Sequence, residues 1–284
     1  MTRSNACRSH ISVFRESEHI GTVAGVCLKL EVETYPKPGL VSRVDSGAHR
    51  DMDAALLIRS ADALVPFFID LASAGAAGMD MGRLRVIGLA AEKAMLLATA
   101  GVNTHRGAIF GLGLLCAAAA FRAHRRMAVP LGRIVSSCCG ADILRGPIPL
   151  HSHGTIVARR YAVGGARREA AAGFPSIYRT ALPILQKIAI ELPNDPEAAR
   201  VQACMALIST VEDTNLLYRG GQSGLAYARE RAREFLDRGG VMRADWRVPA
   251  AKIHAELVSR NLSPGGCADL LAMSLFVQKV SRSC

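Results

Sequence analysis

Apolar positions along the chain recur at helical spacing, and short polar stretches rich in proline or glycine separate the apolar runs. Between residues 16 and 33, Val23, Val26, Cys27 and Leu30 lie three or four positions apart, which predicts an amphipathic helix. Similar patterns predict helices over about 54–73, 82–99, 103–124, 130–144, 176–190, 196–218 and 222–238, and a last helix after Pro264. No parallel β-α alternation and no fixed-period repeat is visible, so the pattern predicts an all-α fold.

The chain is long and apolar enough for a single compact multi-helix domain. It has 284 residues, of which 50% are hydrophobic and 5% aromatic, so helices can pack closely through small and branched side chains. Residues 1–15 are polar and are predicted to form a flexible N-terminal arm, which leaves residues 16–284 as the all-helical domain. The polar motifs fall in loops at the ends of the predicted helices.

The apolar runs, the N-terminus and the cysteines together predict a protein of the cytoplasm with no membrane span. The longest run covers residues 108–121 between two arginines and is too short to cross a bilayer. The N-terminus lacks an apolar signal core. Eight cysteines occur without a Cys-x-x-Cys pair, which indicates reduced thiols in a reducing compartment.

The charge of the chain favours a polyanionic ligand. The formal net charge of +11 would attract nucleic acid, an acidic membrane or a phosphorylated small molecule. The basic residues occur in short scattered clusters with no aromatic residues between them, and no nucleic-acid-binding module is recognisable. We therefore expect a phosphorylated small molecule and no nucleic acid.

The stretch Gly-Val-Asn-Thr-His-Arg-Gly at 101–107 places polar chemistry at the start of the predicted central helix. Asn103 or Thr104 can cap this helix, and its free N–H groups together with Arg106 would suit a phosphate. A capped helix with a structural role for His105 fits the same residues equally well.

A second polar cluster contains Asp45, His49, Asp51 and Asp53 within nine residues. Carboxylate oxygens next to a substrate phosphate are ligands that Mg²⁺ prefers, which favours a metal site here. Alternatively, Asp51 and Asp53 only complement the N-terminus of the helix that follows.

Three further signals accompany these clusters. Two prolines hold Lys37 in an extended segment that ends at Gly39. Glu212, Asn215 and Arg219 share one face of the helix predicted over 196–218, and the glycines at 220 and 221 end it. His151 and His153 form a His-x-His pair without further ligands nearby, so a transition-metal site is not expected there.

Seven short motifs occur in a characteristic order. They are Tyr-Pro-Lys-Pro-Gly-Leu-Val (35–41), Ser-Gly-Ala-His-Arg-Asp-Met-Asp (46–53), Gly-Val-Asn-Thr-His-Arg-Gly (101–107), Ser-His-Gly (152–154), Glu-Asp-Thr-Asn (212–215), Arg-Gly-Gly (219–221) and Asn-Leu-Ser-Pro-Gly-Gly-x-Ala-Asp (261–269). With these motifs, roughly residues 20–280 resemble the triphosphoribosyl-dephospho-CoA synthase family.

The resemblance implies an all-helical transferase that uses ATP and 3′-dephospho-CoA as substrates and releases adenine. It also implies that residues 16–284 form the catalytic domain. The product is the precursor of the prosthetic group on the acyl carrier protein of malonate decarboxylase or citrate lyase, and a phosphoribosyl-dephospho-CoA transferase would receive it. The segment at 56–68 is more similar to the malonate decarboxylase branch. A homodimer is compatible with this assignment.

The resemblance also implies roles for the motif residues. We hypothesise that Glu212 or Asp45 is the general base and that His49 or His105 polarises the leaving adenine. Mg²⁺, brought with ATP, would be held by Asp51, Asp53 and Asp213. Direct phosphate partners would be Lys37, Arg106 and Arg219. The remaining substrate-binding candidates are Gly39, Asn103, Thr104, His153, Asn215, Gly220, Ser263, Gly265 and Gly266.

Two other functions use part of the same evidence. A helical metal-dependent nucleotide phosphohydrolase would use His49, Asp51 and Asp213, and would release phosphate while the base stays attached. A basic nucleic-acid binder would need only the positive charge and would show a steep salt dependence.

Overall fold

Helices form all the regular secondary structure of the computed structural model, which describes residues 3–147 and 153–282. The α-helices are α1 (Arg3–Glu33), α2 (Ala54–Ala77), α3 (Met81–Ala98), α4 (Arg106–His124), α5 (Leu131–Arg145), α6 (His153–Tyr161), α7 (Gly165–Ala171), α8 (Leu182–Glu191), α9 (Pro196–Thr210), α10 (Thr214–Asp237), α11 (Arg247–Ser259) and α12 (Gly265–Arg282). A π-helical turn, η1 (Ile177–Ala181), precedes α8, and a short 3₁₀ turn, η2 (Gly240–Met242), follows α10. The predicted all-α class is confirmed.

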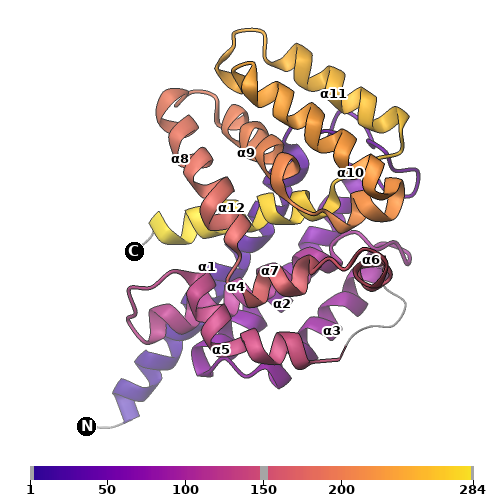
Figure 1. Cartoon of the computed structure of the whole chain (residues 1–284). Helices are drawn as coiled ribbons and strands as arrows, with labels where there is room; N and C mark the ends of the chain where they lie inside the picture. Colours follow the sequence, from indigo (N-terminus) through magenta and orange to yellow (C-terminus); the bar gives the residue numbers. More distant parts are fainter. Residues whose placement is uncertain (1–2, 148–152, 283–284) are drawn as a thin grey trace.

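The last helix, α12, joins two groups of helices into one domain. Figure 1 shows α12 crossing between α8–α11 on one side and α2–α7 on the other. It contacts α8, α9 and α10 on the first side and α4 on the second, and it also contacts α1. The prediction of a single compact multi-helix domain is therefore confirmed.

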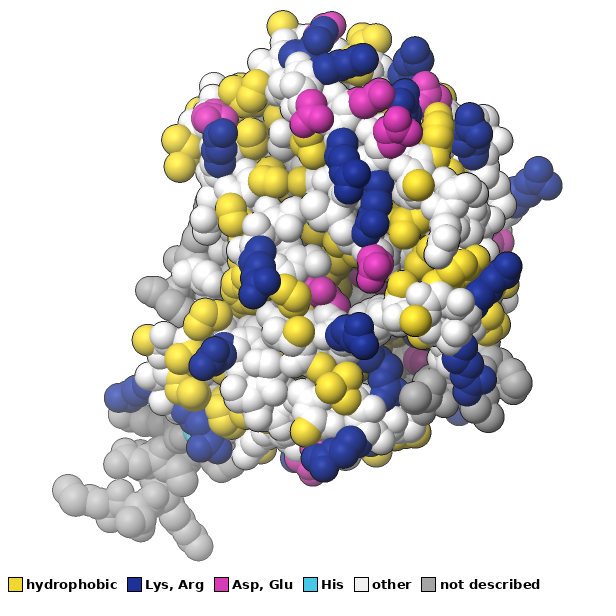
Figure 2. All heavy atoms as spheres, in the orientation of Figure 1, with side chains coloured by type: hydrophobic (Ala, Val, Ile, Leu, Met, Phe, Trp, Pro, Cys, Tyr) yellow, Lys and Arg dark blue, Asp and Glu magenta, His cyan; other side chains and the backbone are white. Residues whose placement is uncertain are grey.

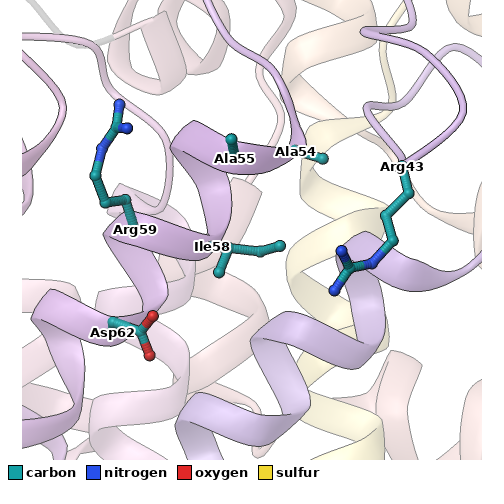
Figure 3. A pocket seen from close by; sticks show the side chains of 6 residues that line it. All are labelled: Arg43, Ala54, Ala55, Ile58, Arg59 and Asp62. Atoms are coloured by element: carbon teal, nitrogen blue, oxygen red, sulfur yellow. The ribbon is translucent and has the colours of Figure 1, made fainter.

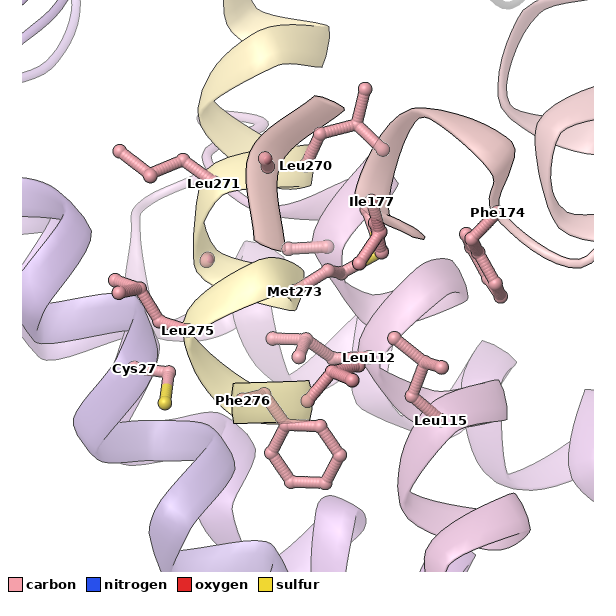
Figure 4. Close-up of a cluster of buried hydrophobic side chains, with 14 of the residues drawn as sticks. Cys27, Leu112, Leu115, Phe174, Ile177, Leu270, Leu271, Met273, Leu275 and Phe276 are labelled. Carbon is pink, nitrogen blue, oxygen red and sulfur yellow. The ribbon is translucent and has the colours of Figure 1, made fainter. Parts of the chain in front are cut away.

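Helix α4 lies at the centre of the core. It contacts α1, α2, α3, α5 and α12, and most of its residues between Ala108 and Ala120 are buried. In the core cluster of Figure 4, Leu112 and Leu115 of α4 lie beside Met273 and Phe276 of α12. Among the described residues α4 is the one helix long and apolar enough to cross a membrane, but 67% of the apolar window is buried by the other helices. Packing inside the fold thus accounts for its apolar composition.

The helix boundaries differ from the prediction at three places. Helix α1 begins at Arg3, inside the segment predicted as an arm, and Figure 1 shows its first turns projecting past the other helices; the flexibility of residues 1–15 stays a prediction. The single helix expected over 196–218 is wrong, because α9 ends at Thr210 and α10 begins at Thr214. Helix α10 then continues to Asp237 through a kink at Gly221, whose φ of 61° favours glycine.

The crossing of α2 and α4 depends on small side chains. A Cβ atom placed on Gly75 of α2 would lie 2.1 Å from the carbonyl oxygen of Ala117 on α4. Backbone atoms cannot move aside as a flexible side chain can, so the two helices need glycine at this position to approach so closely.

We therefore expect Gly75→Ala to lower the free energy of unfolding by about 3 kcal/mol, because the methyl group forces α2 away from α4. Gly88→Ala is the matched control. Gly88 is also inside a helix, but no atom lies within 4 Å of its added Cβ, and the substitution should stabilise by about 0.5–1 kcal/mol. Urea unfolding followed by far-ultraviolet circular dichroism measures both, and equal midpoints for the two variants would contradict the tight crossing.

Candidate active site

The buried carboxylate of Asp213 ties the N-terminus of α10 to that of α12. Its Oδ1 accepts hydrogen bonds from the backbone N–H groups of Asn215 (2.8 Å) and Leu216 (3.1 Å), and its Oδ2 accepts one from Cys267 (2.8 Å). Burial raises the pKa of Asp213, and these backbone hydrogen bonds oppose the rise. Both oxygens are thus engaged by backbone, which makes Asp213 a double helix cap and does not support the expected role as a Mg²⁺ ligand.

Asp269 joins the same region to the N-terminus of α4. Its carboxyl group accepts a hydrogen bond from the backbone of Ala108, and a Cβ atom added to Gly107 would lie 2.0 Å from its Oδ2. Burial raises the pKa of Asp269 well above its usual value, and the nearby Glu31 and Asp213 raise it further. Asp269 was not among the candidate residues, although it ends the motif at 261–269, which was the available signal.

Lys37 is wholly buried and forms an ion pair with Glu31 of α1. The backbone around it turns at Gly39, where φ is +68° and an added Cβ would lie 2.0 Å from the carbonyl oxygen of Leu262. The ammonium group has no exposed face, so the structure does not place it where a phosphate could bind directly. Glu31 was missed because it lies in an ordinary amphipathic helix sequence.

His105 lies at the N-terminus of α4, and its ring contacts the Ser60 hydroxyl, which in turn contacts the Thr104 hydroxyl. Its Nδ1 lies 2.7 Å from Ser60 Oγ of α2, and the Thr104 hydroxyl donates to the same Ser60 oxygen at 2.7 Å. The ring is 5% exposed. Burial lowers the pKa of His105 to about 4, and the charge of Lys37 contributes to the shift. The imidazole is therefore neutral near pH 7.

His49 and Arg219 form a second polar cluster at the rim of the site. The Nε2 of His49 lies 2.9 Å from Ser263 Oγ, and Arg219 donates to His49 Nδ1 at 3.1 Å. Arg219 also donates to the Ala48 carbonyl (2.8 Å) and to Asn261 Oδ1 (2.7 Å). Burial and the Arg219 charge lower the pKa of His49. Arg219 thus clamps three segments together, and most of its donors are used by the protein itself.

Asp45 pairs with a histidine that the sequence analysis did not select. The Nε2 of His254 on α11 lies 3.0 Å from the Asp45 carboxylate, and its Nδ1 lies 2.7 Å from the Lys37 carbonyl oxygen. Both ring nitrogens thus lie within hydrogen-bond distance of an oxygen acceptor. His254 was missed because α11 was not predicted, although Ala250, Ile253, His254 and Leu257 have helical spacing.

Asp51 and Asp53 line a shallow pocket of about 300 Å³ at the N-terminus of α2, together with Ser46, Arg50, Met52, Leu56 and Arg59. Asp53 caps the helix through Oδ1, which accepts from the Leu56 N–H at 2.8 Å. A neighbouring pocket of about 440 Å³ shares Arg59, and Figure 3 shows its floor of Ala54, Ala55 and Ile58 between Arg43 and Arg59. Among the described residues, no group of three or more His, Cys, Asp or Glu side chains could hold a metal ion.

Helix α2 carries both a residue that lines the pocket at Asp51 and Asp53 and the hydrogen-bond partner of His105. Leu56 lines the pocket, and Ser60, the partner of His105, lies one helical turn further on the same face. Neither of the two pockets is lined by Lys37, His105, Asp213 or Asp269.

Several predicted binding residues have mainly structural contacts. Asn103 Oδ1 accepts from the Arg106 N–H at 3.3 Å, and Arg106 pairs with Glu92 of α3. The N-cap residue of α4 is His105, so the expectation that Asn103 or Thr104 occupies the cap position is wrong. A Cβ on Gly220 would meet Leu262, one on Gly265 would meet Asn215, and one on Gly266 would meet Asp213.

Glu212 lies in the exposed loop between α9 and α10, so it does not share a helix face with Asn215 and Arg219 as expected. The cause is that α9 ends at Thr210 and a new helix, α10, begins at Thr214 with Asp213 as its N-cap, so Glu212 lies between the two helices. His151 lies outside the described residues, and of His153 only the backbone at the start of α6 is described.

The motif at 261–269 is the point at which the others meet. Leu262 contacts the motif at 35–41 and Gly220, Ser263 contacts His49, Cys267 contacts Asp213, and Asp269 contacts Gly107. Five motifs that are far apart in sequence thus touch one segment, and the N-termini of α4, α10 and α12 converge there. Helix N-termini carry partial positive charge and favour anionic groups.

A family model described as ATP:dephospho-CoA triphosphoribosyl transferase matches residues 17–283. The chain belongs to this transferase family. The triphosphoribosyl-dephospho-CoA synthase resemblance seen in the motifs is thereby confirmed.

Similar proteins of bacteria agree with this triphosphoribosyl transferase assignment. The "2-(5''-triphosphoribosyl)-3'-dephosphocoenzyme-A synthase" of Pectobacterium atrosepticum is 39% identical, with 94% of this chain and 92% of the relative covered. A relative in Acinetobacter calcoaceticus, named "Probable 2-(5''-triphosphoribosyl)-3'-dephosphocoenzyme-A synthase", is 34% identical, with 96% and 94% covered. No solved structure matches the chain.

Because His105 of this transferase is buried, we predict that the free energy of unfolding falls in acid. The pKa of His105 is about 4 in the fold and about 6.5 in the unfolded chain, so between these values only the unfolded chain binds the proton. This contribution is fully present above pH 6.5 and is lost as the pH falls toward 4, by about 2 kcal/mol at pH 5.

We expect His105→Gln to remove this part of the pH dependence. Urea unfolding at pH 7.5 and pH 5 would measure it, with His124→Gln, at an exposed position near the end of α4, as the control. An unchanged acid sensitivity in His105→Gln would contradict a neutral buried imidazole.

Proposed function

We propose that this protein joins ATP to 3′-dephospho-CoA, forms 2′-(5″-triphosphoribosyl)-3′-dephospho-CoA and releases adenine. The observation that carries the proposal is the match of residues 17–283 to the triphosphoribosyl transferase family, together with the contact of five family motifs at one segment. The relatives are covered over more than nine tenths of their length by this chain.

The reaction breaks the bond between C1′ of the ATP ribose and N9 of adenine, and forms a bond between C1′ and the 2′-oxygen of the acceptor. Positive charge develops on the sugar and negative charge on the departing base. A neutral hydrogen-bond donor would stabilise the base without adding positive charge beside the sugar. His105 is suited to this task, because its lowered pKa keeps the ring neutral.

The triphosphate would lie in the pocket that contains Asp51, Asp53, Arg50 and Arg59. Mg²⁺ usually binds through one or two carboxylates and completes its coordination with phosphate oxygens and water. Asp51 and Asp53 fit this pattern, since Asp51 is exposed and Asp53 has a second carboxylate oxygen beyond the one that caps α2. When bound, the ion would neutralise the phosphate charge.

The acceptor hydroxyl must lose a proton, and Glu212 is our candidate for the base. It is exposed beside Asp213, and among the described residues it has no hydrogen-bond partner. The alternative base, Asp45, is already engaged in a hydrogen bond with His254.

We further propose that the product passes to a phosphoribosyl-dephospho-CoA transferase and an acyl carrier protein in the malonate decarboxylase branch. The similarity of the segment at 56–68 supports this branch. Six cysteines in the described part of the chain are free thiols, five of them buried, which is consistent with the cytoplasm. A homodimer stays a prediction. The phosphohydrolase alternative has no support, because the family is one of transferases.

Adenine release tests the reaction directly. The protein incubated with MgCl₂, ATP and 3′-dephospho-CoA should produce free adenine, separated by liquid chromatography, and ATP alone should produce none. Release of phosphate with the base still attached would contradict the transferase and identify a phosphohydrolase.

Two variants test the assigned roles. His105→Gln should lower the rate of adenine release by about 100-fold, the usual effect of losing one donor to developing negative charge. Asp53→Asn keeps a capping oxygen but removes the charge, and should raise the KM for ATP by about tenfold. Asp80→Asn is the matched control, because Asp80 caps α3 in the same way and lies outside the pocket. Equal kinetics of Asp53→Asn and Asp80→Asn would exclude the proposed phosphate site.

A further inference from the structure

Ser60 is a buried polar residue to which neither the motifs nor the family assigns a role. It lies in the second turn of α2, its exposed fraction is 0%, and its hydroxyl is shared between two partners from the loop before α4. Ser60 Oγ lies 2.7 Å from Thr104 Oγ1 and 2.7 Å from His105 Nδ1. Each of these distances is that of a short hydrogen bond, so the three groups form a connected chain.

The number of protons in this chain determines where the proton of His105 lies. The Thr104 hydroxyl donates to Ser60 Oγ, so the single Ser60 proton is left for the other partner, His105 Nδ1. A nitrogen that accepts this proton cannot carry one itself. In a neutral imidazole the proton must then be on Nε2.

We infer that Ser60 is a positioning residue which, with Thr104, fixes His105 as the tautomer protonated on Nε2 and aims that N–H at the substrate. Among the described residues, Nε2 has no hydrogen-bond partner, although the ring is buried. His105 has an exposed fraction of 5%, so it is not wholly enclosed. A buried donor without a protein partner can bind an acceptor atom of a ligand.

The identity of that acceptor rests on the proposed function. The ring nitrogens of adenine have lone pairs that gain electron density as the bond from C1′ to N9 breaks. A donor on Nε2 would stabilise this density, whereas the other tautomer would present a lone pair and repel it. The proton stays on Nε2 throughout, and the departing adenine takes up a proton from water. Ser60 therefore changes the barrier only through the position of the imidazole.

The tautomer can be observed without any activity. In the protein labelled with ¹⁵N-histidine, the His105 signals are assigned by their loss in His105→Gln. We expect a protonated Nε2 and an unprotonated Nδ1 at pH 7. A protonated Nδ1 would overturn the inference, and this result would leave the adenine-release reaction untouched.

Kinetics of Ser60→Ala supply the second test. The variant leaves Nδ1 without its donor and the ring less fixed, so kcat for adenine release should fall by at least about tenfold while the KM for 3′-dephospho-CoA changes by less than about twofold. Ser60→Thr keeps the hydroxyl and should restore most of the loss.

The matched control is Ser274→Ala. Ser274 is equally buried, and its hydroxyl donates only to the Leu270 carbonyl inside α12. Equal kcat values for Ser60→Ala and Ser274→Ala would overturn the inference. If the unmodified protein releases no adenine, the proposed function fails, and the ¹⁵N spectrum still decides the tautomer.

Discussion

The three hydrogen bonds accepted by the Asp213 carboxylate are the interaction on which the site depends. Helix N-termini leave N–H groups without partners, and a buried end requires something to accept them. One carboxylate meets this need for α10 and α12 together. Because the segment at 261–269 leads into α12 and touches five motifs, the position of α12 determines how these motifs face one another. Asp213, which was expected to bind a metal, therefore acts by fixing the positions of α10 and α12 relative to each other.

Burial divides the polar residues into two groups with different capabilities. His105 and Asp269 lie inside the fold, where the cost of burying charge lowers the pKa of the imidazole and raises that of the carboxyl group. Lys37 is buried there as well, in an ion pair with Glu31. Asp51, Asp53 and Arg59 line an open pocket that water and a ligand can enter. A reaction that must both hold a triphosphate and release a neutral base needs each kind of environment, and α2 connects the two.

The sequence predicted the fold better than the roles of single residues. Helical spacing of apolar residues is a local property, so the all-α class and most helices could be read from it, and the order of the motifs identified the family. The roles of Lys37 and Asp213 could not be read from the sequence, because a buried ion pair and a cap shared with a distant helix are tertiary contacts. Glu31, Ser60 and His254 were missed for the same reason, since each lies in an unremarkable helical sequence.

The position of α12 at the end of the helix order has a consequence for how the protein is made. Translation proceeds from the N-terminus, and α12 supplies both the partner of the Asp213 carboxylate and the core contacts with α4. Until α12 has been synthesised, the earlier helices therefore lack the element that completes the site. A product of interrupted synthesis that ends before α12 would leave Asp213 without its hydrogen bond from Cys267 and α4 without one of its packing partners.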